Sequence, residues 1–289
     1  MKKKTIITLM LCALFGFSAM TQEKKTFTVN GVSFNMVYVQ GGTFQMGAQN
    51  ENPNGANYDS EAFSWEKPVH SVTLSDYYIG ETEVTQELWE AVMGTTVEQQ
   101  RKKAEEYYGF ECDLYGVGST YPMYYISWDE CQEFIKKLNQ LTGKNFSLPT
   151  EAQWEYAARG GNKSRGYKYA GSDTIGEVAW YDVNACDGVG SSSPDYGTHR
   201  VGTKSANELG LYDMSGNVYE WCSDWDGDYS TSSQTNPTGP TTGSLRVLRG
   251  GCWIDGAQYC RVAYRHHNNP DYRNDGYGFR LACGLWPIG

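Results

Sequence analysis

The pattern of hydrophobic and polar positions predicts short strands near the start of the chain and a helix after them. Alternating apolar positions in "FNMVYVQ" and the paired glycines of "GGTFQMG" indicate strand, turn and strand within residues 27–70. The stretch "VTQELWEAVMG" is typical of a short helix capped by Thr85 and stopped by Gly94. Residues 95–122 are charged at first and then rich in Gly and Tyr, which predicts a helical turn and a long surface loop.

Two further helices have clearer start signals. Ser127 and Glu130 form a capping box before apolar residues at helical spacing, and Thr150 and Gln153 repeat it in "LPTEAQWEYAARGG". Both helices are amphipathic and are expected to cover one side of a sheet. From residue 162 onward the chain is rich in Gly, Ser, Asp and Tyr, with only short β-like pieces. Without a linker or a repeat, the prediction is one α+β domain with much irregular structure.

The first residues are typical of an export signal. Three lysines precede an apolar run that ends at about Phe17, and the polar string "TQEKK" follows. This pattern predicts a signal peptide over residues 1–21, cleavage near Thr21, and a domain over residues 22–289. The mature protein is then expected to be secreted or periplasmic. No later run approaches the roughly 18 apolar residues that a membrane-spanning helix needs.

Composition narrows the class of partner. The chain of 289 residues has a formal net charge of −10, and loss of the three leader lysines makes it −13. So acidic a surface argues against nucleic acid, whose binding depends on Lys and Arg that neutralise phosphates. The 22 tyrosines and 33 glycines favour a loop-rich fold in which tyrosines supply rigid contact area.

Six ordered strings resemble one family across nearly the whole mature chain. They are "GGTFQMG", "VHSVTLSDYYIGETEVTQELWEAVMG", "LPTEAQWEYAARGG", "ELGLYDMSGNVYEWCSDW", "RVLRGGCW" and "GYGFRLA". Their order and spacing are similar to the formylglycine-generating enzyme family, also called sulfatase-modifying factor domains. The resemblance implies a modified C-type-lectin-like fold with little regular secondary structure.

The same resemblance raises a question of chemistry. The family oxidases carry two reactive cysteines, five residues apart, that bind copper(I) and attack a cysteine of a sulfatase; thiolates suit this soft ion. Counting forward from the "GG" of "RVLRGGCW" places the first on Asp255, and counting back from Arg265 leaves Cys260 four positions late for the second. Neither thiol is matched. Cys252 and Cys260 are the displaced candidates, but eight residues is wide spacing for an unaided soft-metal site.

Seven cysteines remain after export, and an oxidising compartment favours disulfides among them. An odd number leaves at least one thiol free or paired elsewhere, and the connectivity stays open. Cys252 and Cys260 are interpreted as structural thiols or disulfide partners. The alternatives are that one is free and inert, or that the two carry out redox or copper chemistry.

The resemblance also implies a structural calcium site in "LYDMSGNVYE". Carried over by position, its ligands are Asp213, Gly216, Val218 and Glu220, a mixture of carboxylate and carbonyl oxygens that suits a hard cation. The alternative is that the two acidic residues only cap a turn. The nearby "DWDGDY" fails as an EF-hand loop because Tyr229 stands at its sixth position, so a solvated acidic turn is predicted there.

The C-terminal stretch carries the functional hypothesis. Between its framework residues stand many Tyr, His, Asp and Gly residues, the composition of a binding surface of rigid aromatic and adaptable polar groups. The pattern resembles the variable region of target proteins of diversity-generating retroelements; ordinary solvent-facing loop residues are the alternative. The predicted ligand-binding residues are Trp253, Tyr259, Tyr264, His266, His267, Tyr272 and Tyr277.

The sequence therefore predicts an exported domain of this family that is non-catalytic and binds a protein, peptide or glycan ligand. The alternative is a copper-dependent formylglycine-generating oxidase that modifies a sulfatase cysteine.

Overall fold

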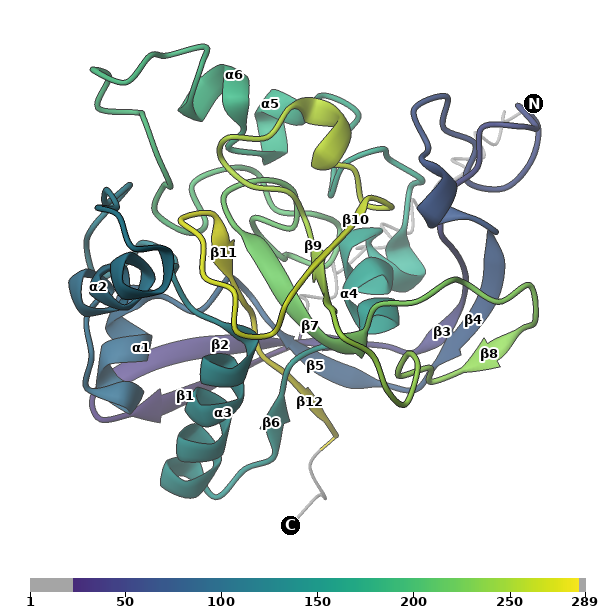
Figure 1. Cartoon of the computed structure of the whole chain (residues 1–289). Helices are drawn as coiled ribbons and strands as arrows, with labels where there is room; N and C mark the ends of the chain where they lie inside the picture. Colours follow the sequence, from purple (N-terminus) through teal and green to yellow (C-terminus); the bar gives the residue numbers. More distant parts are fainter. Residues whose placement is uncertain (1–22, 286–289) are drawn as a thin grey trace, which may run out of the picture.

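The computed structural model describes residues 23–285 and shows three sheets with helices packed around them (Figure 1). The predicted signal peptide lies outside the described residues. The strands are β1 (Lys24–Val29), β2 (Val32–Val39), β3 (Gly42–Met46), β4 (His70–Leu74), β5 (Tyr77–Gly80), β6 (Phe146–Ser147), β7 (Tyr219–Trp225), β8 (Gln234–Thr235), β9 (Arg246–Arg249), β10 (Arg265–Asn268), β11 (Tyr277–Gly278) and β12 (Ala282–Gly284). The helices are α1 (Gln86–Met93), α2 (Val97–Tyr108), α3 (Trp128–Thr142), α4 (Glu151–Ala158), α5 (Ile175–Val178) and α6 (Asp182–Ala185).

The sheets join distant parts of the chain. The largest has the order β1-β2-β5-β12-β6, so the C-terminal strand lies between β5 and β6, two strands that come far before it in the sequence. The second sheet has the order β10-β9-β7-β11, in which β11 runs parallel to β7 with Tyr277 opposite Tyr219. The third contains β3, β4 and β8. Long stretches between these strands are irregular, which confirms the predicted α+β class with much irregular structure.

The helix starts confirm the capping signals. The hydroxyl of Thr85 accepts from the backbone N–H of Leu88 at the start of α1, and Gly94 ends that helix with φ 72°. The two predicted capping boxes are present at α3 and α4. An isolated cap of this kind stabilises a helix by about 1 kcal/mol.

The prediction for residues 95–122 is wrong in its first half. A helix of 12 residues, α2, replaces the expected helical turn, and it also begins with a capping box, from Thr96 and Gln99. Its charged sequence hides the pattern because only Val97, Gln100 and Ala104 are buried. These are spaced by three and four residues, so one narrow stripe is enough to dock the helix.

Four buried arginines fix the irregular C-terminal segment. Each pairs with a buried glutamate from elsewhere in the fold. Removing one partner of such a pair would leave the other as an uncompensated buried charge. The pairs are Arg249 with Glu155, Arg261 with Glu66, Arg265 with Glu151, and Arg280 with Glu220.

Within residues 23–285, every helix is too short or too polar to cross a membrane.

Candidate ligand-binding site

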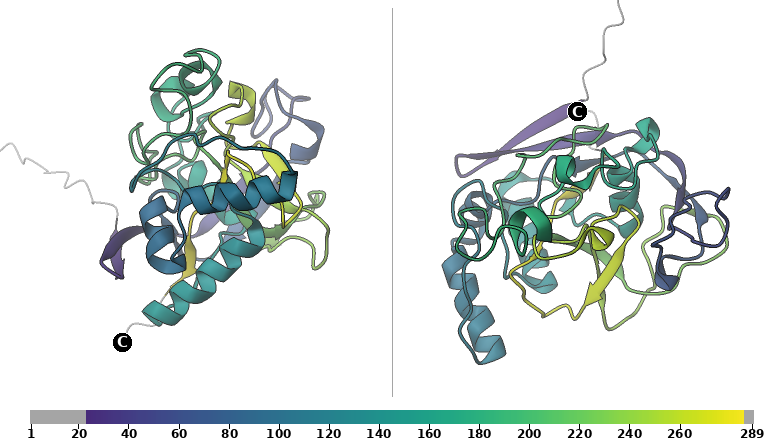
Figure 2. Two further views of the ribbon diagram at one scale, coloured as in Figure 1. Left: turned by 60° about the vertical axis from the view of Figure 1, so that its left-hand side comes forward. Right: turned by 90° about the horizontal axis from the view of Figure 1, so that it is seen from above.

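The C-terminal segment occupies the middle of one face of the molecule. Seen from above in Figure 2, its yellow trace lies between the purple loop before β4 and the green loops around α5 and α6. Here the irregular backbone presents side chains from β10, from β11 and from the 3-10 turn Ala257–Tyr259. The predicted binding residues belong to this segment.

The structure separates these seven side chains by exposure. Tyr259, His266 and Tyr272 are half-buried, and His267 is exposed. Trp253, Tyr264 and Tyr277 are buried, so these three side chains do not face solvent.

Each buried ring is enclosed by other aromatic rings. Trp253 packs against Tyr115 and Tyr196, with ring centroids 4.8 and 5.2 Å apart. Tyr277 packs edge-on against Trp221 at 5.6 Å. Composition alone cannot separate such supporting rings from contact rings, because both are aromatic.

Contacts between rings continue across this face as an aromatic band. Neighbouring rings in the band have centroids 4.7 to 6.1 Å apart, except for Tyr264 and Tyr219, which are linked by an electrostatic interaction between their hydroxyl groups. In order, the band consists of Trp65, Phe63, Tyr259, Tyr264, Tyr219, His266, Tyr277, Tyr272, Tyr108 and Phe110.

Both ends of the band come from segments that the sequence pattern did not single out. Trp65 is 48% exposed and follows the polar loop before β4, and Phe110 is 62% exposed just after α2. The rings of Trp65 and Phe63 are stacked, with an angle of 6° between their planes. Large apolar side chains left this exposed often mark contact surfaces. The available sequence signal was aromatic residues inside stretches that are otherwise polar.

Hydrogen bonds fix the polar groups at the centre of the band. His266 Nε2 lies 2.7 Å from the hydroxyl of Tyr277, and Asn268 donates to that hydroxyl at 3.2 Å. Burial and the neighbouring His267 lower the pKa of His266 to about 4, so its ring is neutral at physiological pH. His267 itself lies 3.1 Å from a carboxylate oxygen of Asp226. The centre of the band is therefore rigid, aromatic and uncharged.

Cys252 lies under this surface beside a carboxylate. Its Sγ is 3.3 Å from Oδ2 of Asp255, which also accepts the backbone N–H of Cys252 at 3.0 Å. Burial and the Asp255 charge raise the pKa of the Cys252 thiol well above its usual range. The thiol consequently stays protonated at neutral pH, whereas copper(I) binding and nucleophilic attack need a thiolate.

Cys260 is equally buried and packs tightly against Gly251, where an added Cβ atom would lie 2.8 Å from the Cys260 Sγ. Burial, followed by the charges of Asp255 and Asp182, raises the pKa of the Cys260 thiol well above its usual range. It also stands five residues after Asp255, the spacing of the family thiols, so counting forward fills the second position and corrects the backward count. The first position still carries a carboxylate.

No disulfide joins any cysteine within the described residues, where all seven are free thiols. Cys252 and Cys260 are therefore structural thiols here rather than a bonded staple. Cys112 is the one of the seven that is not buried.

The predicted calcium ligands do not fit a calcium ion. Glu220 has both carboxylate oxygens occupied: Arg280 donates to each at 2.6 Å, and Trp154 donates to Oε2 at 2.6 Å. Oδ2 of Asp213 accepts from the backbone N–H of Gly202 at 2.7 Å. The Arg280 guanidinium group already occupies the Glu220 carboxylate as its ion-pair partner. Calcium therefore remains a prediction from resemblance, without support in this donor set.

Asp213 instead forms an acidic pair with Glu83. Oδ1 of Asp213 and Oε2 of Glu83 are buried without a hydrogen-bond partner in the described structure. Burial raises the pKa of Asp213 to about 6, and burial together with the Asp213 charge raises the pKa of Glu83 well above its usual range.

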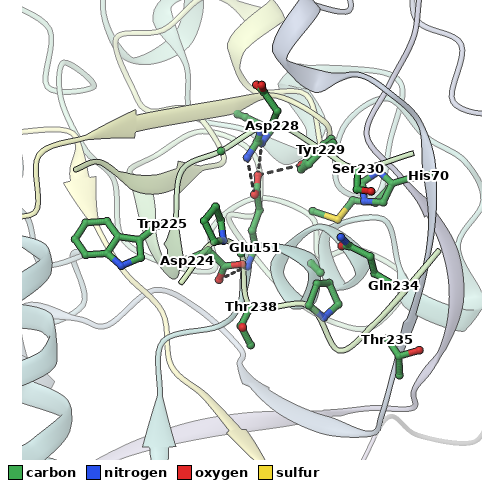
Figure 3. Close-up of a pocket in the computed structure, with 17 residues that line it drawn as sticks. His70, Glu151, Asp224, Trp225, Asp228, Tyr229, Ser230, Gln234, Thr235 and Thr238 are labelled. Atoms are coloured by element: carbon green, nitrogen blue, oxygen red, sulfur yellow. Dashed lines mark hydrogen bonds and ion pairs between the residues drawn. The ribbon is translucent and has the colours of Figure 1, made fainter. Parts of the chain in front are cut away.

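The acidic string "DWDGDY" is only partly solvated. Asp228 is exposed, but Asp224 is 3% exposed, so the predicted solvated turn is wrong for this carboxylate. Asp224 lines a cavity of about 530 Å³ next to the start of α4, shown in Figure 3. The sequence gives no sign of this cavity because its walls come from β4, α4, β7 and the loop around β8, which are far apart in the chain.

Comparison with known proteins identifies the family. Residues 21–285 match the model of the sulfatase-modifying factor enzyme 1-like domain, and the chain belongs to this family. The chaperone protein LppX of Paenibacillus barcinonensis is 32% identical and aligns over 91% of this chain and 92% of its own length. The formylglycine-generating enzyme of Streptomyces coelicolor is 31% identical over 85% and 88% of the two chains.

Solved structures share the fold. Treponema denticola variable protein 1 has a TM-score of 0.71 and is 33% identical, with 92% of this chain and 100% of that chain covered. PvdO from Pseudomonas aeruginosa, at 23% identity and a TM-score of 0.66, covers 91% and 100% and shows the fold alone. The family thus includes proteins named as enzymes and proteins named otherwise.

Proposed function

We propose that this chain is a non-catalytic binding domain that holds a protein, peptide or glycan ligand on the aromatic band. The observation that carries the proposal is the continuity of the band between two exposed ends, Trp65 and Phe110, over an uncharged centre fixed by hydrogen bonds. Rigid rings that are already ordered lose little conformational entropy on binding, which favours recognition of a ligand surface.

The thiols beneath the band argue against the oxidase alternative. The two candidate cysteines are buried, and the charge of Asp255 contributes to the raised pKa of both thiols. A reactive cysteine needs access and a lowered pKa. This region supplies a packed base for a surface rather than a reactive pair.

The names of the relatives give some support to the binding proposal and some to the oxidase alternative. A similar solved structure is named a variable protein, which agrees with a C-terminal segment whose contact residues change while its framework stays. Another relative is named a chaperone, a function exerted by binding. The named formylglycine-generating enzymes, together with Cys260 at the second thiol position, keep the oxidase as the second candidate.

Ligand selection followed by substitution tests the proposal. Ligands are selected from a glycan array and a random-peptide library with the full chain, and the affinity of the best one is measured by calorimetry. We expect Trp65→Ala and Tyr272→Ala to weaken binding at least about tenfold, the usual effect of truncating an aromatic anchor. Leu141→Ala, which truncates another exposed apolar side chain on α3, is the matched control and should leave the affinity within about twofold.

Failure of selection in both libraries, or equal binding by the band variants and wild type, would overturn the proposal. Cys260→Ser serves as a second control, because a binding role for the band predicts that this thiol is dispensable for affinity.

A further inference from the structure

A second candidate site lies in the cavity beside α4. None of the rings of the aromatic band lines it. Its walls come from His70, from the end of β7, from the residues around β8 and from the start of α4 (Figure 3). Its volume of about 530 Å³ is within the range of small-molecule sites.

The cavity has apolar walls suited to a hydrocarbon chain or ring. The rings of His70 and Tyr229 are in contact, with centroids 4.7 Å apart. Pro237, Pro240 and Met46 complete this lining. Such walls favour a ligand with an apolar portion and leave its orientation to a few polar groups.

One of the two buried carboxylates in the wall already has its counterion. Arg265 donates to both oxygens of Glu151 at 2.5 and 2.8 Å, and the hydroxyl of Tyr229 donates to Oε1 at 3.0 Å. The dashed lines in Figure 3 mark these contacts. Glu151 and Arg265 together contribute no net charge to the cavity.

Asp224 is the carboxylate without a counterion. Its Oδ2 accepts from the backbone N–H of Glu151 at 3.0 Å and from the hydroxyl of Ser223 at 2.9 Å. Among residues 23–285 no hydrogen bond reaches its Oδ1 and no cation lies within ion-pair distance of either oxygen, and the charge of Arg265, which is paired with Glu151, acts on Asp224 only from farther away. Burial and the charge of Glu151 raise the pKa of Asp224 to about 7. Asp224 is 3% exposed and lines the cavity, and a buried carboxylate without a counterion is unfavourable. A positively charged group in the cavity would supply that counterion.

We propose that this cavity binds a ligand through one protonated amino or guanidinium group placed against Oδ1 of Asp224. The apolar stem of the ligand lies against Tyr229 and the proline rings. The chemistry fits a lysine or arginine side chain or a small amine. A divalent metal ion does not fit, because one free carboxylate oxygen is too few donors for such an ion.

Titration with matched ligands tests this site. The full chain is titrated calorimetrically with cadaverine and with a blocked glycine pentapeptide that carries a central lysine. A pentapeptide with norleucine in place of lysine has the same stem without the charge. We expect the norleucine peptide to bind at least tenfold more weakly than the lysine peptide. Binding of both cationic ligands identifies the amine alone as sufficient, and binding of the peptide alone identifies a chain-borne lysine; either supports the site.

Two substitutions locate the contact. Asp224→Asn keeps an oxygen that can accept the two present hydrogen bonds but removes the charge, and we expect at least a tenfold loss of affinity. Asp195→Asn removes an exposed charge outside the cavity lining and should change affinity by less than twofold. If Asp224→Asn does not fold, Thr238→Trp fills the cavity from an exposed loop position and should cause the same loss. No binding of either cationic ligand, equal binding of the norleucine peptide, or full affinity in these variants would overturn the proposal.

Discussion

Burial and, after it, the charge of Asp255 keep the thiols below the aromatic band protonated. Asp255 lies 3.3 Å from the Sγ of Cys252, and its charge contributes to the raised pKa of both Cys252 and Cys260. A single carboxylate thus stands where the family oxidases have their first thiol, and it opposes ionisation of the second. Burial of the two thiols, reinforced by this carboxylate, is the main physical reason for preferring binding over oxidation.

Alkylation of the native protein tests the state of the thiols. Cys112 is half-buried while the other six described cysteines are buried, so iodoacetamide at pH 8 should modify Cys112 first. Peptide mapping by mass spectrometry after a short reaction checks this, and Cys112→Ser should remove the fast phase. Rapid modification of Cys252 or Cys260 in the folded protein would contradict the assignment of both as inert structural thiols.

The acidic pair of Asp213 and Glu83 predicts a pH-dependent stability. Because folding raises the pKa of Asp213 from 3.8 to about 6, its stabilising contribution is complete below about pH 4 and is lost as the pH rises through 6. Asp213→Asn removes this loss and suits the positive φ of 57°. The free energy of unfolding of the variant minus that of wild type should be roughly 1–3 kcal/mol larger at pH 7.5 than at pH 4.5. Urea unfolding at both pH values measures this difference. An equal stability difference at both pH values would contradict the raised pKa of Asp213.

Single residues were the hardest level to predict from sequence. Tyr259 and Tyr264 have the same chemistry and stand five positions apart, yet the first is half-buried and the second is covered by Phe63 and by Tyr259 itself. In irregular backbone no period links position to face, so exposure follows from tertiary packing. Asp224 lies in β7, and its burial was missed because it depends on packing against the start of α4, which is far away in sequence.

At the level of elements, features that depend on neighbouring residues were predicted better than features that depend on contacts between distant segments. Capping boxes marked the starts of α3 and α4 because a cap is made by residues next to one another in sequence. The length of α2 was missed because its docking depends on a narrow buried stripe. The rings that extend the band from α2 and from the loop before β4 depend on contacts between segments far apart in the chain.

The pair of Arg280 and Glu220 joins the strand segments around β5 and β7. Arg280 also donates to the backbone carbonyl of Gly80 at 2.9 Å. Glu220→Gln should destabilise the protein by about 3–5 kcal/mol because it leaves the guanidinium buried without its partner. Since this arginine fills the place of a cation, calcium should not shift the wild-type thermal midpoint by more than about 1 °C relative to EDTA. A larger calcium-dependent rise, lost in Glu220→Gln, would instead establish the calcium site.

For the whole molecule, the residues that hold the fold differ from the residues that are proposed to contact a ligand. The four buried Arg–Glu pairs hold the C-terminal segment, and half of the ten rings of the band lie between the arginines of that segment. Contact side chains can change on such a frame without loss of the fold. The sequence strings identified this scaffold correctly, because they carry its buried framework.

If the C-terminal segment is a diversified variable region, the surrounding DNA should show it. The DNA near the gene should contain a near-copy of the last hundred or so bases that differs only at adenine positions, and sequencing of independent isolates should show changes at half-buried band positions such as Tyr259 and Tyr272. Arg261 and Arg265 should stay unchanged, since each is a buried ion-pair partner. A neighbouring sulfatase gene without such a copy would favour the oxidase.

The most direct test of a binding rather than catalytic role is turnover of a sulfatase-derived peptide containing Cys-x-Pro-x-Arg. The protein is loaded with copper(I), incubated with the peptide in air and analysed by mass spectrometry for conversion of the peptide cysteine to formylglycine. The account predicts no product above a copper-only control, for wild type and for Cys260→Ser alike. Formation of formylglycine by wild type, abolished in Cys260→Ser, would contradict it.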